Sequence, residues 1–599
     1  MKNYEPYALY LERLAWQGCT QPHKCIKTSL SSTFNHQANL LLPYFTMVLP
    51  FALLHLWESV GAATNEKFQN TRNCDTSAFT APVIPGAKVL SMTAEERRDV
   101  DIPAATALFQ PLSNLNFCEI KVYLAHPGAN DRVLVQTWLP LSQDLWNGRF
   151  QATGGGAWAT GMLDIALGPA IASGYAASST DGGHPFDFFA ADWVLNEDKS
   201  INWDLVHNFA TRSLAEQVYV GKSLTEQFYG RQPRYSYWNG CSQGGRQGYA
   251  VAQRYPGLLD GVLAAAPALK LPNVIMSGIW PIIAMQEAGT LVSNCEFNWV
   301  ASKALEECDI LDGAKDGVIG DPEACTFDPL SLVGQKIDCS GHEIEVTGAM
   351  VDVFHKVHQG PTTPFGINVF PGVPYGAPLN VFLNVTIDSN GVRTLNDPGV
   401  LDVFPRTILL KDSNFNVSKL TTSEYFALWV QANEEYGWIL DTDNSDLSAF
   451  RDAGAKLLSW HGINDPIIPY QNTVKYRQHV EREMGGAKTV DDFFRLFLAP
   501  GVEHCGFGAG AVPKDPLESL LGWVERGELP KTLTSETRNQ EGELVTRDLC
   551  RYPRTPKYLA IGDINNASSW SCEGVDGEEE GDFAGKLNDG LMQVGLGWD

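Results

Sequence analysis

The stretch that decides the fold is Gly240-Cys241-Ser242-Gln243-Gly244. It has the G-x-S-x-G pattern, in which a serine occupies a tight turn between a strand and a helix. Residues 235–238 before it are typical of a short strand, and residues 246–255 after it are typical of a helix that stops at Pro256-Gly257. Glycine is common in this chain, so without these flanks the pattern would indicate only a turn. With them it predicts an α/β fold that presents Ser242 as a nucleophile.

A serine hydroxyl needs a base and an acid that orients the base, and in α/β-hydrolases these follow the serine in the order acid, histidine. Asp465 fits the acid, because it lies in a loop after the apolar residues 457–460 and precedes a proline. His504 fits the base, because it lies in a glycine-rich loop after the apolar residues 494–498. His461 is an alternative base, and an isolated loop aspartate is often only a turn former.

Stabilising the negative charge that develops during acyl transfer requires backbone N–H donors. One expected donor is the amide of Gln243, directly after the nucleophile. The second is expected from the glycine run at 154–156, and Gly155 is the predicted residue. A phosphate-binding loop is the alternative for this run, but no lysine-serine pair follows it.

Motifs along most of the chain resemble the tannase and feruloyl esterase family. The resemblance runs from Cys74 to Cys572, and its motifs lie at residues 237–248, 265–268, 460–465, 500–506 and 523–525. It implies an α/β-hydrolase catalytic domain with a large inserted lid domain. It also implies a serine carboxylic ester hydrolase that cleaves feruloyl, other hydroxycinnamoyl or galloyl esters through an acyl-enzyme on Ser242. A serine peptidase or another aromatic-ester hydrolase of the same fold, or a non-catalytic secreted binding protein, is the alternative.

The same resemblance implies a disulfide between Cys241 and Cys505, next to Ser242 and His504. A disulfide holds its two Cα atoms within about 4.4–6.8 Å, so this bridge would keep the serine near the histidine. It would also act as a staple that contributes roughly 2–5 kcal/mol. The order of the cysteines and the family pattern suggest four further pairs: Cys74–Cys118, Cys295–Cys339, Cys308–Cys325 and Cys550–Cys572. Cys19 and Cys25 have no assigned partner.

An acidic loop follows Cys308 and carries Asp309, Asp312 and Asp316 with glycines between them. Such spacing allows a loop to fold around a hard cation through oxygen ligands, although acidic turns without metal are common. The resemblance implies a structural Ca²⁺ held by these three side chains and by the carbonyls of Ala314 and Val318. It implies no organic cofactor.

Composition limits the partners. The chain has 599 residues, 44 Lys and Arg against 70 Asp and Glu, and a formal charge of −26. We therefore expect neither nucleic acid nor a stable membrane partner, and a phenolic ester, free or linked to a polysaccharide, as the substrate. The oligomeric state is not predicted.

Several features predict a secreted, extracellular protein. Twelve cysteines favour an oxidising compartment, and residues 47–63 resemble a signal peptide. Translation from Met47 would make the upstream residues an extension, and a signal anchor from Leu40 is the alternative. Glycosylation sequons lie at Asn384, Asn416 and Asn566.

The predicted organisation has four parts. Residues 1–66 are an N-terminal extension that contains the apolar segment 47–63. Residues 67–268 and 453–599 form the catalytic domain, the latter with a C-terminal tail. Residues 269–452 form the inserted lid domain with the calcium loop, where we expect substrate selectivity to reside.

Overall fold

The computed structural model describes residues 73–104, 110–339, 341–379, 385–396, 401–412 and 414–574. The predicted extension over 1–66, the signal-like segment 47–63, Cys19, Cys25, Asn384 and most of the C-terminal tail lie outside these ranges. No helix within the described ranges has the length and apolarity that a membrane crossing requires.

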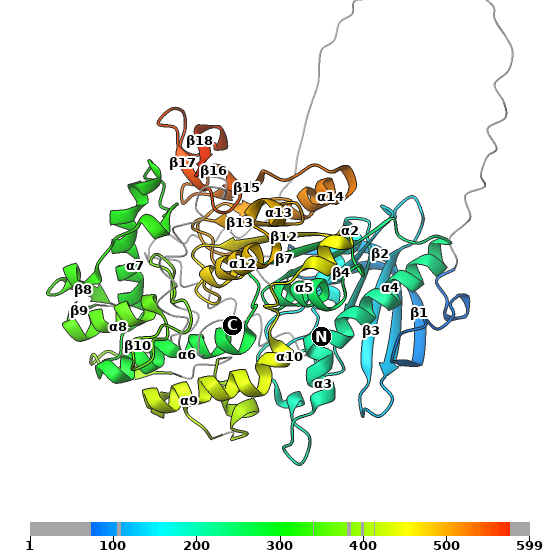
Figure 1. Ribbon diagram of the computed structural model, residues 1–599, viewed down its shortest axis with the longest axis horizontal. Coiled ribbons are helices and arrows are strands. Elements are labelled where there is room, and N and C mark those ends of the chain that lie inside the picture. Colours follow the sequence, from blue (N-terminus) through cyan, green and yellow to red (C-terminus); the bar gives the residue numbers. More distant parts are fainter. Residues whose placement is uncertain are drawn as a thin grey trace, which may run out of the picture. The chain divides into compact units, whose positions relative to one another are not determined.

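A nine-stranded mixed sheet organises the catalytic part, in the order β1-β2-β3-β5-β4-β6-β7-β12-β13 (Figure 1). The pairs from β1 to β5 are antiparallel, and all pairs from β5 to β13 are parallel. This is the predicted α/β class. The strands are β1 (Lys88–Ile102), β2 (Leu112–Ala125), β3 (Val133–Pro140), β4 (Arg149–Thr153), β5 (Ala176–Thr180), β6 (Tyr235–Cys241), β7 (Gly261–Ala265), β12 (Lys456–Gly462) and β13 (Phe494–Ala499).

Helices cover both faces of this sheet. Alternate side chains of its central strands therefore enter two different cores. Trp238 belongs to the core with α4, α5 and α12, whereas Tyr237, its neighbour on β6, belongs to the core with α2 and α14. Buried strands of this kind read as nearly continuous apolar runs. The helices are α2 (Asp164–Ala172), α3 (Trp203–His207), α4 (Ser213–Tyr229), α5 (Gln243–Arg254), α12 (Gln471–Met484), α13 (Ala487–Asp491) and α14 (Pro516–Arg526).

The segment between β7 and β12 supplies most of a third hydrophobic core, in which Trp280, Phe354 and Tyr425 are buried. It shares this core with residues outside the segment, among them Trp158 and Phe209. Its division from the catalytic part at residues 269 and 452 stays a prediction. Its elements are α6 (Leu271–Ala288), α7 (Asn294–Cys308), β8 (Lys336–Cys339), β9 (His342–Glu345), α8 (Gly348–Gln359), β10 (Val385–Ile387), β11 (Arg393–Leu395), α9 (Thr422–Ala432), α10 (Trp438–Leu440) and α11 (Ser448–Asp452).

Two small antiparallel sheets complete the C-terminal part. One has three strands and the other has two. Their strands are β14 (Val512–Pro513), β15 (Thr532–Arg538), β16 (Leu544–Cys550), β17 (Thr555–Tyr558) and β18 (Trp570–Glu573).

Disulfides join all ten cysteines that the structure describes. All five predicted pairs are confirmed: Cys74–Cys118, Cys241–Cys505, Cys295–Cys339, Cys308–Cys325 and Cys550–Cys572.

The contact between α4 and the sheet depends on a glycine, which gives a test of the packing. A Cβ at Gly221 would lie 2.3 Å from Cε2 of the buried Phe150 ring. We expect Gly221→Ala to lower the free energy of unfolding by about 1–3 kcal/mol, measured by denaturant titration, because the core must shift to admit the methyl group. The control is Gly348→Ala at the start of α8, where no atom lies within 4 Å of an added Cβ. Equal unfolding free energies for the two variants would contradict this account of the packing.

Candidate active site

Ser242 lies in the turn between β6 and α5. Its backbone has φ 63° and ψ −124°, a conformation that non-glycine residues rarely adopt. The turn is tight, because a Cβ at Gly240 would lie 2.5 Å from the carbonyl oxygen of Gly244. The side chain is half-buried. The helix predicted from residue 246 begins three residues earlier, at Gln243, because the chain turns directly from Ser242 into α5.

Asp465 lies in the loop after β12 and is fully buried. Its Oδ1 accepts hydrogen bonds from the amides of Ile467 (2.8 Å) and Ile468 (2.9 Å). Its Oδ2 lies 2.7 Å from Nδ1 of His504 and 3.2 Å from Nε2 of His461. Burial alone would raise the pKa of Asp465, but the charge on His504 and the hydrogen bonds from both histidines together lower it well below its ordinary value. The carboxylate is therefore held in its charged form.

His504 lies in the loop after β13, half-buried, in a short turn of 3-10 helix at His504–Gly506. Because Nδ1 is bonded to Asp465, Nε2 is the nitrogen left to act as a base. The Cys241–Cys505 disulfide sets the Cα atoms of those cysteines 5.9 Å apart and so keeps Ser242 near His504. In the described chain no direct hydrogen bond joins the Ser242 hydroxyl to His504; such bonds often tighten only when substrate binds.

His461, the alternative base, is fully buried with both ring nitrogens occupied. Its Nδ1 lies 2.8 Å from Oγ1 of Thr473, and its Nε2 lies 2.8 Å from the carbonyl of Ile468 as well as near Asp465. No nitrogen remains to accept a proton from a serine. The structure therefore places His461 behind Asp465, where it helps to orient the carboxylate.

Two residues next to the predicted triad were not predicted to matter. Burial, with repulsion from Asp465, raises the pKa of Glu503 to about 7. A carboxyl group that is a much weaker acid than an ordinary glutamate therefore precedes His504. Asn464 accepts a hydrogen bond from the amide of Gly501 (3.2 Å) and donates one to the carbonyl of Gly376 (2.9 Å). Its side chain thus ties the acid loop to the histidine loop and to the inserted segment. Adjacency to Asp465 and His504 is the only sequence signal for either residue.

The glycine run lies directly against the start of α5, as a Cβ at Gly154 would lie 2.5 Å from Cα of Gly244. The predicted donor role of Gly155 nevertheless does not hold in this structure, because its N–H is already donated to Oε1 of Gln247 at 2.8 Å. Gln243 is the first residue of α5, so its N–H belongs to the helix-terminal groups that lack an intrahelical acceptor.

The acidic loop brings the three predicted carboxylates together. Asp309 and Asp312 are buried, and burial with mutual repulsion raises the pKa of Asp312 to about 7. Asp316 forms an ion pair with Arg547 at 2.5 Å, and its other oxygen is buried without a hydrogen-bond partner. Within the described residues no group of three or more His, Cys, Asp or Glu side chains is arranged to hold a metal ion. Asp309 accepts hydrogen bonds from the amides of residues 316–318. The buried carboxylates of Asp309 and Asp312 and the buried, unbonded oxygen of Asp316 are nevertheless donors of the type that a hard cation prefers.

This loop also supports the histidine loop. A Cβ at Gly501 would lie 2.8 Å from Cγ2 of Val318, so the end of the acidic loop packs against the chain three residues before His504.

Comparisons with known proteins identify the family of the chain. The family model described as tannase and feruloyl esterase matches residues 118–573. A probable feruloyl esterase of Arthroderma benhamiae is 41% identical over 536 residues, which cover 89% of this chain and 98% of that protein. Feruloyl esterase B of Aspergillus niger is 30% identical over 484 residues, 77% of this chain and 87% of that protein.

Solved structures give the same result for the fold. The crystal structure of feruloyl esterase B from Aspergillus oryzae has a TM-score of 0.69 and 28% identity, covering 82% of this chain and 97% of that one. Tannin acyl hydrolase from Aspergillus niger has a TM-score of 0.74 at 23% identity, covering 82% and 92%, and supports the fold alone. The chain therefore belongs to the tannase and feruloyl esterase family and is a carboxylic ester hydrolase of the α/β-hydrolase fold.

Proposed function

We propose that this protein is a secreted serine esterase that cleaves phenolic esters, of feruloyl, other hydroxycinnamoyl or galloyl type, with Ser242, His504 and Asp465 as its catalytic triad. The observation that carries the proposal is the 2.7 Å contact between His504 Nδ1 and the buried Asp465. The loop of His504 is also joined by a disulfide to Cys241, the residue before Ser242. The names of the relatives support the ester class.

The proposed reaction follows from the order of these groups. His504 Nε2 takes the proton of the Ser242 hydroxyl as its oxygen attacks the ester carbonyl, and the amide of Gln243 donates to the developing oxyanion. His504 then gives the proton to the departing alcohol, which leaves the acyl group on Ser242. A water molecule, deprotonated by the same nitrogen, releases the phenolic acid and restores the serine. The charged Asp465 stabilises the imidazolium that forms in each half-reaction.

Secretion is supported by the five disulfides, which persist in oxidising compartments. Asn416 and Asn566 are exposed, as glycosylation requires. We propose the inserted segment as the lid that selects the acyl group, because it contacts the acid loop at Asn464.

The decisive experiment compares substrates and variants. We expect hydrolysis of methyl ferulate or methyl gallate, without cleavage of a peptide panel. We expect Ser242→Ala to abolish it and Asp465→Asn to lower kcat by about 10⁴-fold, because the imidazole loses its orientation. Ser302→Ala, at an exposed position on α7, is the matched control and should keep full activity. Activity that survives in Ser242→Ala would exclude the proposed nucleophile, and peptide cleavage would replace the proposed substrate class.

Removing the bridge beside the triad tests whether it positions the catalytic groups. We expect Cys241→Ala with Cys505→Ala to lower kcat by about 10²-fold in the protein that remains folded, because misplacement by about 1 Å has this cost. Cys74→Ala with Cys118→Ala is the control, since it removes a staple at the other side of the sheet. Both pairs should lower the Tm. Equal kcat losses in the two folded variants would leave the bridge with a stabilising role only.

We also propose that Asp309, Asp312 and Asp316, with the carbonyls of Ala314 and Val318, hold a structural Ca²⁺. Such an ion would supply charge neutralisation to the three carboxylates. The purified protein should contain one Ca²⁺ per chain by elemental analysis, and chelation should lower the unfolding free energy by about 3 kcal/mol relative to Ca²⁺ at 100 times its Kd.

Asp312→Asn should remove most of this dependence on Ca²⁺, whereas Asp352→Asn, at an exposed position on α8, should keep it. A protein whose Tm is the same in chelator and in Ca²⁺ would contradict the assignment.

A further inference from the structure

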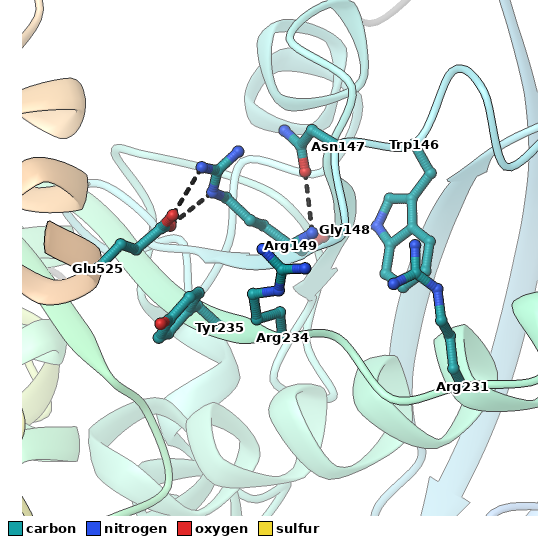
Figure 2. A pocket seen from close by; sticks show the side chains of 8 residues that line it. All are labelled: Trp146, Asn147, Gly148, Arg149, Arg231, Arg234, Tyr235 and Glu525. Carbon is teal, nitrogen blue, oxygen red and sulfur yellow. Dashed lines mark hydrogen bonds and ion pairs between the residues drawn. The ribbon is translucent and has the colours of Figure 1, made fainter. Parts of the chain in front are cut away.

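A polar pocket lies at the amino ends of β4 and β6, away from Ser242 and His504. Figure 2 shows the side chains that line it. Arg149 lies beside Glu525, Arg231 lies along the ring of Trp146, and Arg234 also lines the pocket. The register of the parallel pair places Arg149 opposite Tyr235 at this edge of the sheet. Ser242 follows the other end of β6, and six residue rises of about 3.3 Å separate the strand ends by roughly 20 Å. The pocket is therefore not part of the ester site.

The walls of the pocket are fixed by direct contacts. Arg149 Nε and Nη2 bind the Glu525 carboxylate at 2.6 and 2.8 Å, and the Tyr237 hydroxyl donates to the same carboxylate at 2.7 Å. Trp146 is buried, stacks on Tyr229 with ring centroids 4.0 Å apart, and donates from Nε1 to the Arg149 carbonyl at 2.8 Å. An ion pair and an aromatic stack thus hold the pocket open in one geometry.

Two guanidinium groups in this pocket lack a compensating carboxylate. The exposed Arg231 lies over the Trp146 ring at 4.7 Å, and the exposed Arg234 uses its backbone amide to bind Gly148. Within the described part of the chain neither side chain forms an ion pair. Glu525 is already neutralised by Arg149. The pocket therefore has a net positive charge, although the formal charge of the whole chain is −26.

We propose that this pocket, formed by Arg231 and Arg234 around the Arg149–Glu525 pair, binds an oxyanion group: a carboxylate, phosphate or sulfate. Its volume of about 120 Å³ is larger than a single water needs. Guanidinium groups bind planar or tetrahedral oxyanions through paired N–H donors, which gives strong, charge-assisted hydrogen bonds. The group could belong to a uronic acid of an acidic polysaccharide or to a free inorganic anion, and the same chemistry serves both.

Calorimetric titration of the full chain tests the site and separates the two sources. The ligands are trigalacturonate, inorganic phosphate and sulfate, at an ionic strength held constant with sodium chloride, and trigalactose is the neutral match. We expect one anion per chain and no binding of trigalactose. Tighter binding of trigalacturonate than of phosphate or sulfate would identify an acidic polysaccharide, and the reverse would identify a free anion.

Variants assign the binding to these residues. Arg231→Gln and Arg234→Gln should each weaken the anion Kd by about tenfold, the loss expected for one charge-assisted hydrogen bond. Arg538→Gln, which removes the same charge from an exposed position on β15, should bind like the original protein. Hydrolysis of methyl ferulate should be unchanged in the two pocket variants, and Ser242→Ala should keep its anion binding. Absence of binding for all three anions, or equal affinities in the pocket variants and in Arg538→Gln, would overturn the proposal.

Discussion

The Cys241–Cys505 bridge is the constraint on which the arrangement of the site depends. In the sheet, β6 and β13 are separated by β7 and β12, so their axes lie about 14 Å apart at the usual strand spacing. The histidine loop must therefore cross the ends of two strands to reach the serine. Only a few residues link Ala499 to His504, and they begin with a turn in which the Val502 amide donates to the Ala499 carbonyl at 3.3 Å. The bridge fixes the far end of that crossing at a Cα–Cα distance of 5.9 Å.

Two residues at this bridge, Ser242 and Cys505, adopt strained backbone conformations. Ser242 has φ 63° and Cys505 has φ 57°, in the left-handed region that costs a non-glycine residue free energy. Surrounding contacts must supply that free energy: Gly240 packs on Gly244, and Gly462 packs on the carbonyl of Val502. Substitution of these glycines would push apart the turns that the disulfide joins. The glycines and the half-cystines therefore act together to place Ser242 and His504 at one edge of the sheet.

The order serine, aspartate, histidine and the apolar strands before each residue predicted the positions of Ser242, Asp465 and His504, because strand ends meet at one edge of a parallel sheet. The disulfide pairs followed from the family pattern. The hydrogen bond from Gly155 to Gln247 could not be predicted, since it joins residues 92 positions apart that meet only when the glycine run packs on α5. His461 was ambiguous for a similar reason: only its contacts with Thr473 through Nδ1 and with Ile468 through Nε2 show that neither nitrogen is free.

The inserted segment supports the site through one backbone carbonyl, that of Gly376, and one apolar side chain, that of Val318. Asn464 binds the carbonyl of Gly376, and Val318 packs on Gly501, so two loops of the insertion reach the acid and histidine loops. Contacts of this kind constrain the backbone and leave the side chains that face a substrate free to vary. If the insertion is the lid proposed above, its substrate-facing side chains could change the acyl preference while the contacts of Gly376 and Val318 keep the acid and histidine loops in place.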